Sequence, residues 1–324
     1  MEPTQAGPSR CLDAFSTALN QADSSGWYSS TLQLQLASLQ FCVMCRSVST
    51  LHLIVKDNIH ALLLEDAPAS DDKVKKLRRT RVPTIRPLIL AWKIPVTYLR
   101  RFSSQVLGNV KELAFGNRFN DKIDDAAWPS SLQRLTFGYD FNRAIDGVVW
   151  PATLQQLTFG EDFDQAIDGV VWPASIQQLT FGWRFNQAID ECVWPATLQQ
   201  LAFGEHFDQA IDGVVWPASL QQLTFGEHFD QAIDGVVWPA SLQQLTFRND
   251  FIEAIDNVVW PASLQQLTFG EFFNQAVNGV SWPASLQQLT FGESFNQAIK
   301  GVVWPASLQQ LTFRDEFDQA IDGV

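Results

Sequence analysis

Apolar positions recur with a period of 22 residues over the last two thirds of the chain. Each unit begins with a Trp-Pro pair, and one unit carries more apolar surface than it can bury alone, so successive units must stack. The pattern predicts a repeat solenoid. The Trp residues that open the units are Trp128, Trp150, Trp172, Trp194, Trp216, Trp238, Trp260, Trp282 and Trp304.

Within a unit, the spacing of Leu154, Leu157 and Phe159 predicts a short β-strand. Alternate side chains of a strand point to opposite faces, so Leu157 and Phe159 face the interior while Gln156 and Thr158 face outward. Stacking then pairs the strands of successive units in parallel. We therefore predict leucine-rich-repeat-like coils with one short parallel strand per unit.

The rest of the unit returns apolar side chains to the same interior. We expect Phe163, Ile167 and Val171 to point inward, and Asp168 with the following Gly to form a turn. The Trp residues are predicted to form a buried ladder, with each indole N–H donating to a backbone carbonyl at the bend before Pro.

The repeat pattern divides the chain into three parts. A degenerate first unit begins at Val106, so residues 106–324 hold about ten units. Residues 83–105 have a similar order of apolar residues in a shifted register, which predicts a divergent capping segment. Residues 1–82 have no clear period, and both a helical cap, including a short helix over 13–21, and divergent coils fit them.

The unit resembles the FNIP repeat, a 22-residue relative of the leucine-rich repeats. Its core is clearest at Phe185–Ile189, Phe273–Val277 and Phe295–Ile299, and the pattern recurs through residues 106–324. The sequence departs from the family in having Trp before Pro, Asp often in place of Asn after Phe, and Ile252 at that same position. The resemblance implies a leucine-rich-repeat-like solenoid used for protein–protein contact.

Charge is divided unevenly along the 324 residues, whose net charge is −13. The first 105 residues carry a net +5 and the remainder a net −18. Phosphate binding needs a positive surface, so the acidic repeats are not expected to bind nucleic acid.

Targeting signals and membrane segments are not evident in the sequence. No run approaches the roughly 18 apolar residues of a membrane span, and the N-terminus lacks a signal-peptide core. Four cysteines without a disulfide framework fit a reducing compartment. We expect an intracellular, cytoplasmic protein without membrane association. The basic run Lys73–Arg81 offers a nuclear-import signal as an alternative to a solvated linker.

Catalytic and metal-binding motifs are sparse. With four His and no phosphate-binding loop, the sequence predicts neither an enzyme nor a cofactor. Cys42 and Cys45 lack a second ligand pair for zinc, and the recurring Asp of the turns, as at Asp168, is interrupted by Lys300. His206 and His228 are spaced to share a metal with Glu205 or Glu227, but duplication of whole units explains them equally, so we predict no metal.

Two positions after each strand vary while their surroundings are copied. Core positions do not accept Arg, His, Phe and Asp interchangeably, so these side chains must be exposed. We predict that they form a partner-binding rim, because Trp, Tyr and Arg carry interface energy. The alternative is neutral drift of solvated loop positions. The predicted rim residues are Tyr139, Asp140, Trp183, Arg184, His206, His228 and Phe272.

The outward-facing strand residues predict a concave polar face. We expect a non-catalytic scaffold that presents this face and the rim to an unidentified protein partner. A surface that binds ice or a glycan by matching its period is the alternative, as is an expanded array without a partner. The last unit lacks a polar cap, which predicts a fragment or end-to-end self-association. The concave face comprises Gln156, Thr158, Gln178, Thr180, Gln222, Thr224, Gln244 and Thr246.

Overall fold

The computed structural model describes residues 51–55, 85–90, 111–124 and 126–321. The helix expected over 13–21, the Cys42 and Cys45 pair and the basic run Lys73–Arg81 lie outside the described residues. Every regular element in the described ranges is a β-strand.

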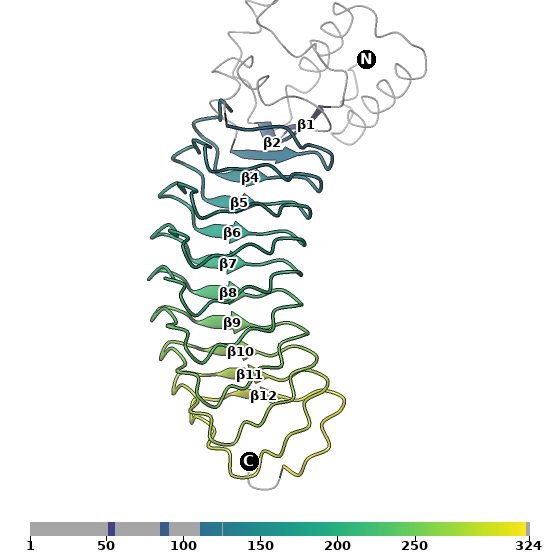
Figure 1. Cartoon of the computed structure of the whole chain (residues 1–324), viewed down its shortest axis with the longest axis vertical. Coiled ribbons are helices and arrows are strands. Elements are labelled where there is room, and N and C mark those ends of the chain that lie inside the picture. Colours follow the sequence, from purple (N-terminus) through teal and green to yellow (C-terminus); the bar gives the residue numbers. More distant parts are fainter. Residues whose placement is uncertain (1–50, 56–84, 91–110, 125, 322–324) are drawn as a thin grey trace, which may run out of the picture.

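The described strands form one parallel sheet in which the order along the sheet is the order along the chain. Each coil contributes one strand, and the row of strands follows the length of the solenoid (Figure 1). This confirms the predicted architecture. The strands are β1 Leu51–Val55, β2 Ile85–Leu90, β3 Glu112–Phe115, β4 Arg134–Thr136, β5 Gln156–Thr158, β6 Gln178–Thr180, β7 Gln200–Ala202, β8 Gln222–Thr224, β9 Gln244–Thr246, β10 Gln266–Thr268, β11 Gln288–Thr290 and β12 Gln310–Thr312.

Neighbouring strands of the repeats pair in the register that the 22-residue period requires. Leu157 of β5 lies beside Leu179 of β6, with Gln156 and Thr158 opposite their counterparts. The central Leu of each strand from β4 to β11 is buried between two partly exposed or exposed residues. The predicted alternation of inward and outward side chains is therefore confirmed.

Two columns of Phe rings fill the interior. In the first, which contains Phe225, ring centroids of successive coils lie 5.3–5.9 Å apart; in the second, which contains Phe229, they lie 5.9–6.2 Å apart. Within a coil the two rings are 4.0–4.2 Å apart, as for Phe225 and Phe229 at 4.1 Å. Each ring thus packs against its own coil and both neighbouring coils, which couples the coils into one core.

The Trp residues form the predicted buried ladder, but the predicted hydrogen bond is wrong. Trp216, Trp238 and Trp260 are each 7% exposed, and Trp216 stacks on Trp238 with ring centroids 6.4 Å apart. The indole Nε1 of each Trp that precedes Pro, from Trp128 to Trp304, is buried without a hydrogen-bond partner in the described structure. Stacking between coils fixes the orientation of each indole ring. The ring keeps its apolar contacts in this orientation, and its N–H does not reach a carbonyl acceptor.

The inward position before Trp was assigned to the wrong valine. Val171 is 78% exposed, whereas Val170, the preceding residue, is 4% exposed and belongs to the core. Val170 donates its N–H to the Ile167 carbonyl, 3.2 Å away, and this tight turn shifts the chain by one residue relative to a continued alternation. The outward residues form an exposed valine row: Val149, Val171, Val193, Val215, Val237, Val259 and Val303.

The residue after the second Phe of each unit connects neighbouring coils. The Oδ1 of Asn186 accepts hydrogen bonds from the Asp208 N–H, at 3.0 Å, and from Gln209 Nε2, at 2.9 Å. Asp208 makes the equivalent two bonds to the next coil. Asn and Asp serve alike because each supplies a carbonyl-type oxygen, which explains why the sequence exchanges them.

Restoring the acceptor at Ile252 is expected to stabilise the protein. The Ile252 N–H donates to Asp230 Oδ1, but the Ile252 side chain has no acceptor, and no bond to the Asn274 N–H is present among the described residues. Ile252→Asn should therefore raise the free energy of unfolding by about 1 kcal/mol, measured by urea denaturation. Ile252→Ala, which adds no acceptor, is the control; equal stability of the two variants would contradict the prediction.

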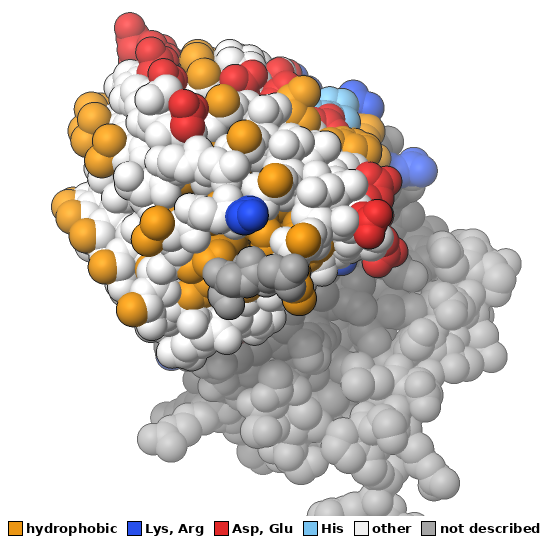
Figure 2. All heavy atoms as spheres, turned by 90° about the horizontal axis from the view of Figure 1, so that it is seen from below, with side chains coloured by type: hydrophobic (Ala, Val, Ile, Leu, Met, Phe, Trp, Pro, Cys, Tyr) orange, Lys and Arg blue, Asp and Glu red, His pale blue; other side chains and the backbone are white. Residues whose placement is uncertain are grey.

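The last coil presents core residues at the end of the solenoid. Trp304, Leu308, Leu311, Phe313 and Phe317 are only partly buried, and apolar side chains reach the surface at this end (Figure 2).

Among the described residues, no helix is long and apolar enough to cross a membrane.

Candidate functional site

The rim positions lie in a tight turn directly after each strand. In the coil of β6, the Phe185 N–H donates to the Gly182 carbonyl at 3.3 Å and closes a turn that contains Trp183 and Arg184. The Arg184 N–H also donates to the Glu161 carbonyl of the previous coil, at 2.8 Å, and the Trp183 carbonyl accepts from the His206 N–H, at 2.9 Å. The rim backbone is thus held coil to coil, and its side chains project from a fixed ladder.

Glycine at the start of this turn permits the close approach of successive coils. A Cβ at Gly226 would lie 1.7 Å from the Gly204 carbonyl oxygen, so a side chain there would clash unless the backbone moved. Arg248 stands at the equivalent position of the next coil, where the backbone accommodates a side chain that reaches Glu227 with an Nη1–Oε1 distance of 3.7 Å.

The predicted rim side chains are exposed or partly exposed. Tyr139 is 42% exposed, Trp183 37% and Phe272 47%, although all three are aromatic. Arg184 is exposed as well, and Asp140 is half-buried. Large aromatic side chains at the surface indicate a contact surface more readily than charged ones do, because burying them against a partner is favourable.

Side chains of the rim in five successive coils form a continuous chain of contacts. Arg184 Nε lies 3.2 Å from Asp162 Oδ1, an ion pair outside hydrogen-bond geometry, and its guanidinium lies 5.8 Å from the centroid of the Trp183 ring. The Trp183 and His206 rings meet edge to face at 4.6 Å, and His206 and His228 at 5.0 Å. With the pairing of His228 and Asp250, these residues make a central rim cluster: Asp162, Trp183, Arg184, His206, His228 and Asp250.

His228 lies between two carboxylates of the neighbouring coils. Its Nδ1 is 2.6 Å from Asp250 Oδ2 and its Nε2 is 3.7 Å from Glu205 Oε1. The hydrogen bond to Asp250 is the largest effect and raises the pKa of His228; desolvation lowers it, and the charges of Asp250, Glu205 and Glu227 raise it further. These carboxylates stabilise the protonated form of His228 relative to an isolated imidazole.

The structure divides the predicted rim residues into two groups. It brings Trp183, Arg184, His206 and His228 together, whereas Tyr139, Asp140 and Phe272 make none of these ring contacts or ion pairs in the described part of the chain. Asp162 and Asp250 also belong to the cluster, although they are not among the predicted rim residues. Each lies one 22-residue unit from its partner, Arg184 and His228, respectively, and this spacing is a signal that the sequence contains.

The polar strand face is regular but only partly exposed. Gln156, Thr158, Gln178 and Thr180 lie in register on β5 and β6, and their side chains are half-buried. Gln178 Nε2 donates to Gln200 Oε1 at 2.6 Å. The corresponding residues on the following strands, Gln222, Thr224, Gln244 and Thr246, are likewise in register and half-buried. Ala202 interrupts the row of Thr on β7.

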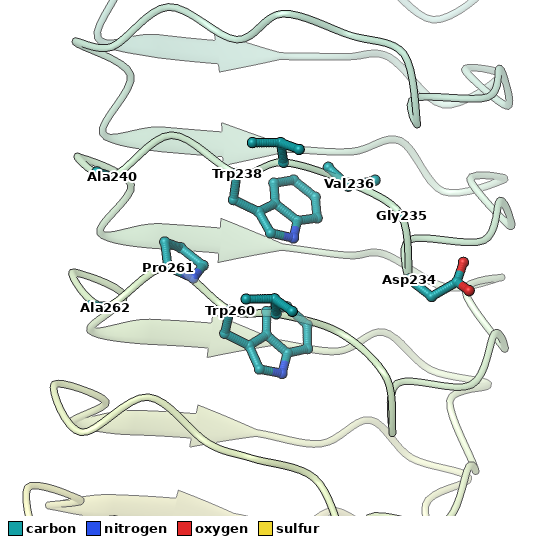
Figure 3. A pocket seen from close by; sticks show the side chains of 10 residues that line it. Asp234, Gly235, Val236, Trp238, Ala240, Trp260, Pro261 and Ala262 are labelled. Atoms are coloured by element: carbon teal, nitrogen blue, oxygen red, sulfur yellow. The ribbon is translucent and has the colours of Figure 1, made fainter.

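A shallow apolar hollow lies between two coils at the Trp ladder. It has a volume of about 410 Å³ and is lined by Val237, Trp238, Val259 and Trp260, with Asp234 at its margin (Figure 3). This lining offers one titratable group, which is a poor basis for acid–base chemistry.

The remaining titratable group of note is Cys192, the one cysteine within the described ranges. It is buried at the inward position that Val occupies in other coils. Burial, with smaller contributions from Asp168 and Asp190, raises its pKa to about 12. Its thiol stays protonated and is a poor nucleophile.

Comparisons with known proteins point to one repeat family and one fold. A family model described as FNIP Repeat matches residues 108–140, 119–162, 163–206, 207–250 and 273–316, which together exceed half of the chain. The crystal structure of CroV588, described as a novel circular LRR protein, is 41% identical with a TM-score of 0.65. The match covers 73% of this chain and 34% of that one, so the chain spans about a third of the length of that structure.

A second solved structure is more distant. An internalin, InlF from Listeria monocytogenes, is 10% identical with a TM-score of 0.44 over 90% of this chain and 94% of its own. No curated protein matches the chain.

Proposed function

The chain belongs to the FNIP repeat family, and we propose that it is a non-catalytic scaffold whose rim binds a protein partner. Leucine-rich-repeat-like solenoids commonly serve as protein-interaction scaffolds and are typically non-catalytic. The proposal rests on their regular core, which holds a variable surface at fixed spacing.

The observation that carries the proposal is the central rim cluster. It places an exposed Trp and an exposed Arg side by side, and residues of these types dominate the energetics of protein interfaces. Backbone hydrogen bonds between coils hold the turns that carry Trp183 and Arg184, so little conformational freedom is lost on binding.

The charge around the cluster indicates the chemistry of the partner. Glu161, Glu227 and Glu271 occupy rim positions beside the cluster or one coil beyond it, on an array whose net charge is strongly negative. We propose that the partner is a protein with cationic groups surrounding a pocket for Trp183, because complementary charge assists association. The same acidity opposes nucleic acid as a ligand of the repeats.

Replacement of Trp183 and Arg184 together by Ala is expected to weaken partner binding by at least 30-fold, the effect of losing an interface hot spot of about 2 kcal/mol. The full chain and the variant would each be used as bait, and the affinity for the captured protein would then be measured by calorimetry. Val237→Ala, an exposed substitution in the valine row, is the matched control.

Two outcomes would contradict this function. Equal affinity of the double variant and the full chain would remove the rim from the interface. Clear thermal hysteresis of the purified protein would instead support the alternative in which the regular Gln and Thr face binds ice. That face has a gap at Ala202 and half-buried side chains, which are weaker grounds for a lattice contact than the exposed rim is for a protein contact.

The cellular setting and self-association stay predictions. We propose an intracellular, cytoplasmic protein without membrane association, with nuclear import through Lys73–Arg81 as the alternative. End-to-end self-association through the partly exposed last coil remains a second proposal, which analytical ultracentrifugation tests directly.

A further inference from the structure

Three potential metal ligands converge on the rim in two adjacent coils. One ligand atom from each of Glu205, His206 and His228 can be chosen so that all lie within 4.8 Å of one another. This is the one such group of three or more His, Cys, Asp or Glu side chains among the described residues. None of the proposed contacts of the rim with a protein partner requires this arrangement.

The ligand set matches a particular class of ion. Two imidazoles and a carboxylate are typical ligands of Zn²⁺, whereas Ca²⁺ and Mg²⁺ prefer oxygen ligands alone. Zinc sites that are not purely structural use three protein ligands and keep a water in the fourth position. Glu205, His206 and His228 supply that number.

The distances require a modest closure of the three side chains. Zinc–ligand distances of about 2.0–2.2 Å place the ligand atoms of a tetrahedral site roughly 3.3–3.5 Å apart. His228 Nε2 and Glu205 Oε1 are already 3.7 Å apart. All three side chains are at the surface, and His206 and His228 meet edge to face with ring centroids 5.0 Å apart, so small rotations bring the nitrogens together.

Asp250 supplies the outer contact that metal-binding histidines usually have. Its Oδ2 lies 2.6 Å from Nδ1 of His228, so a Nδ1–H donated to Asp250 leaves Nε2 with its lone pair directed toward Glu205. A carboxylate in this position orients the ring and increases the basicity of the ligating nitrogen. Asp250 comes from the next coil, so the site spans three coils.

The solenoid backbone fixes the spacing of these groups. The His228 N–H donates to the Glu205 carbonyl at 2.9 Å, and the Asp250 N–H donates to the Glu227 carbonyl at 2.8 Å. The turns that carry the ligands are therefore held before an ion arrives, which reduces the ordering cost of binding.

We propose that Glu205, His206 and His228 form a site for one Zn²⁺ ion, with Asp250 as a positioning residue that acts through His228. The sequence predicts no metal here, because unit duplication accounts for both His. Asp also occupies the equivalent position at Asp140 and Asp162, so what distinguishes Asp250 is its place one coil after His228.

Zinc binding by the full chain tests the proposal. Isothermal titration calorimetry with Zn²⁺ would use a background with Cys11, Cys42 and Cys45 changed to Ser, so that those thiols do not compete. We expect one bound ion, with affinity reduced at least 100-fold by His206→Ala or His228→Ala. Asp250→Ala should weaken binding about 10- to 100-fold, and Asp250→Asn, which retains an acceptor for Nδ1–H, should restore most of the loss.

Matched controls separate a built site from general attraction of cations to an acidic surface. Glu271→Gln removes a carboxylate from the same rim position of a coil without His and should leave zinc affinity unchanged, and Ca²⁺ should not compete. The proposal is overturned if no zinc binds, if both His variants retain full affinity, or if Glu271→Gln weakens binding as much as they do. Circular dichroism confirms that each variant is folded.

Discussion

Phe229→Ala is expected to lower the free energy of unfolding by about 3–5 kcal/mol. The Phe229 ring is fully buried and stacks on four others: Phe225 in its own coil, Phe207 in the preceding coil, and Phe247 and Phe251 in the following one. Removing it creates a cavity that coil-to-coil hydrogen bonds prevent from collapsing. Urea denaturation followed by circular dichroism measures the loss.

Phe317→Ala is the matched control for this prediction. Phe317 holds the same place in the last coil, where it is only partly buried and, among the described residues, stacks on Phe295 and Phe313 alone. Because stability in a solenoid comes from contacts between neighbouring coils, Phe317→Ala should cost clearly less than Phe229→Ala. Equal costs would mean that the Phe columns do not couple the coils.

Much of the fold follows from the period of the sequence. A strand at Gln156–Thr158 with Leu157 inward requires only alternation, and parallel pairing with Gln178–Thr180 requires only that identical units stack. These predictions hold for every unit, because all units share the same sequence pattern and therefore form the same strand with the same residue inward.

The wrong and missing predictions concern the part of each coil that lies outside the strand. The sequence Val170-Val171 offers two equivalent candidates for one inward position, and the turn predicted at Asp168 does not by itself indicate which of the two points inward after it. The Asn and Asp ladder was missed for a related reason. Its acceptors act between coils, at Asn186 and Asp208 for example, and a single unit gives no indication of a bond to the next one.

The candidate site was predictable in position and not in its contacts. Variable residues among copied ones mark the rim, and Trp183 and Arg184 are exposed as expected. Which rim side chains touch depends on rotamers and on the separation of coils, so the pairing of His228 with Asp250 required the structure. The apolar core between neighbouring coils is formed without the rim side chains, so the residues at the rim can change without loss of stability.

Trp238 offers the second large effect. Trp238→Ala is expected to cost about 3–5 kcal/mol, because a ring that is 7% exposed and stacks on Trp216 would leave a cavity beside Phe225. Trp238→Phe should cost about 1 kcal/mol or less, since it keeps an aromatic ring and removes a buried N–H whose desolvation is uncompensated.

Comparison of the two Trp238 variants by urea denaturation tests the unpaired indole directly. The lost apolar area of the smaller Phe ring opposes the gain from removing the N–H, so the two terms should nearly cancel. If Trp238→Phe were as costly as Trp238→Ala, the indole N–H would have to be engaged in a hydrogen bond. Trp304→Phe in the last coil should gain as much from removing the N–H, because Nε1 of Trp304 is buried as well, and should lose less apolar burial, because the ring is only partly buried.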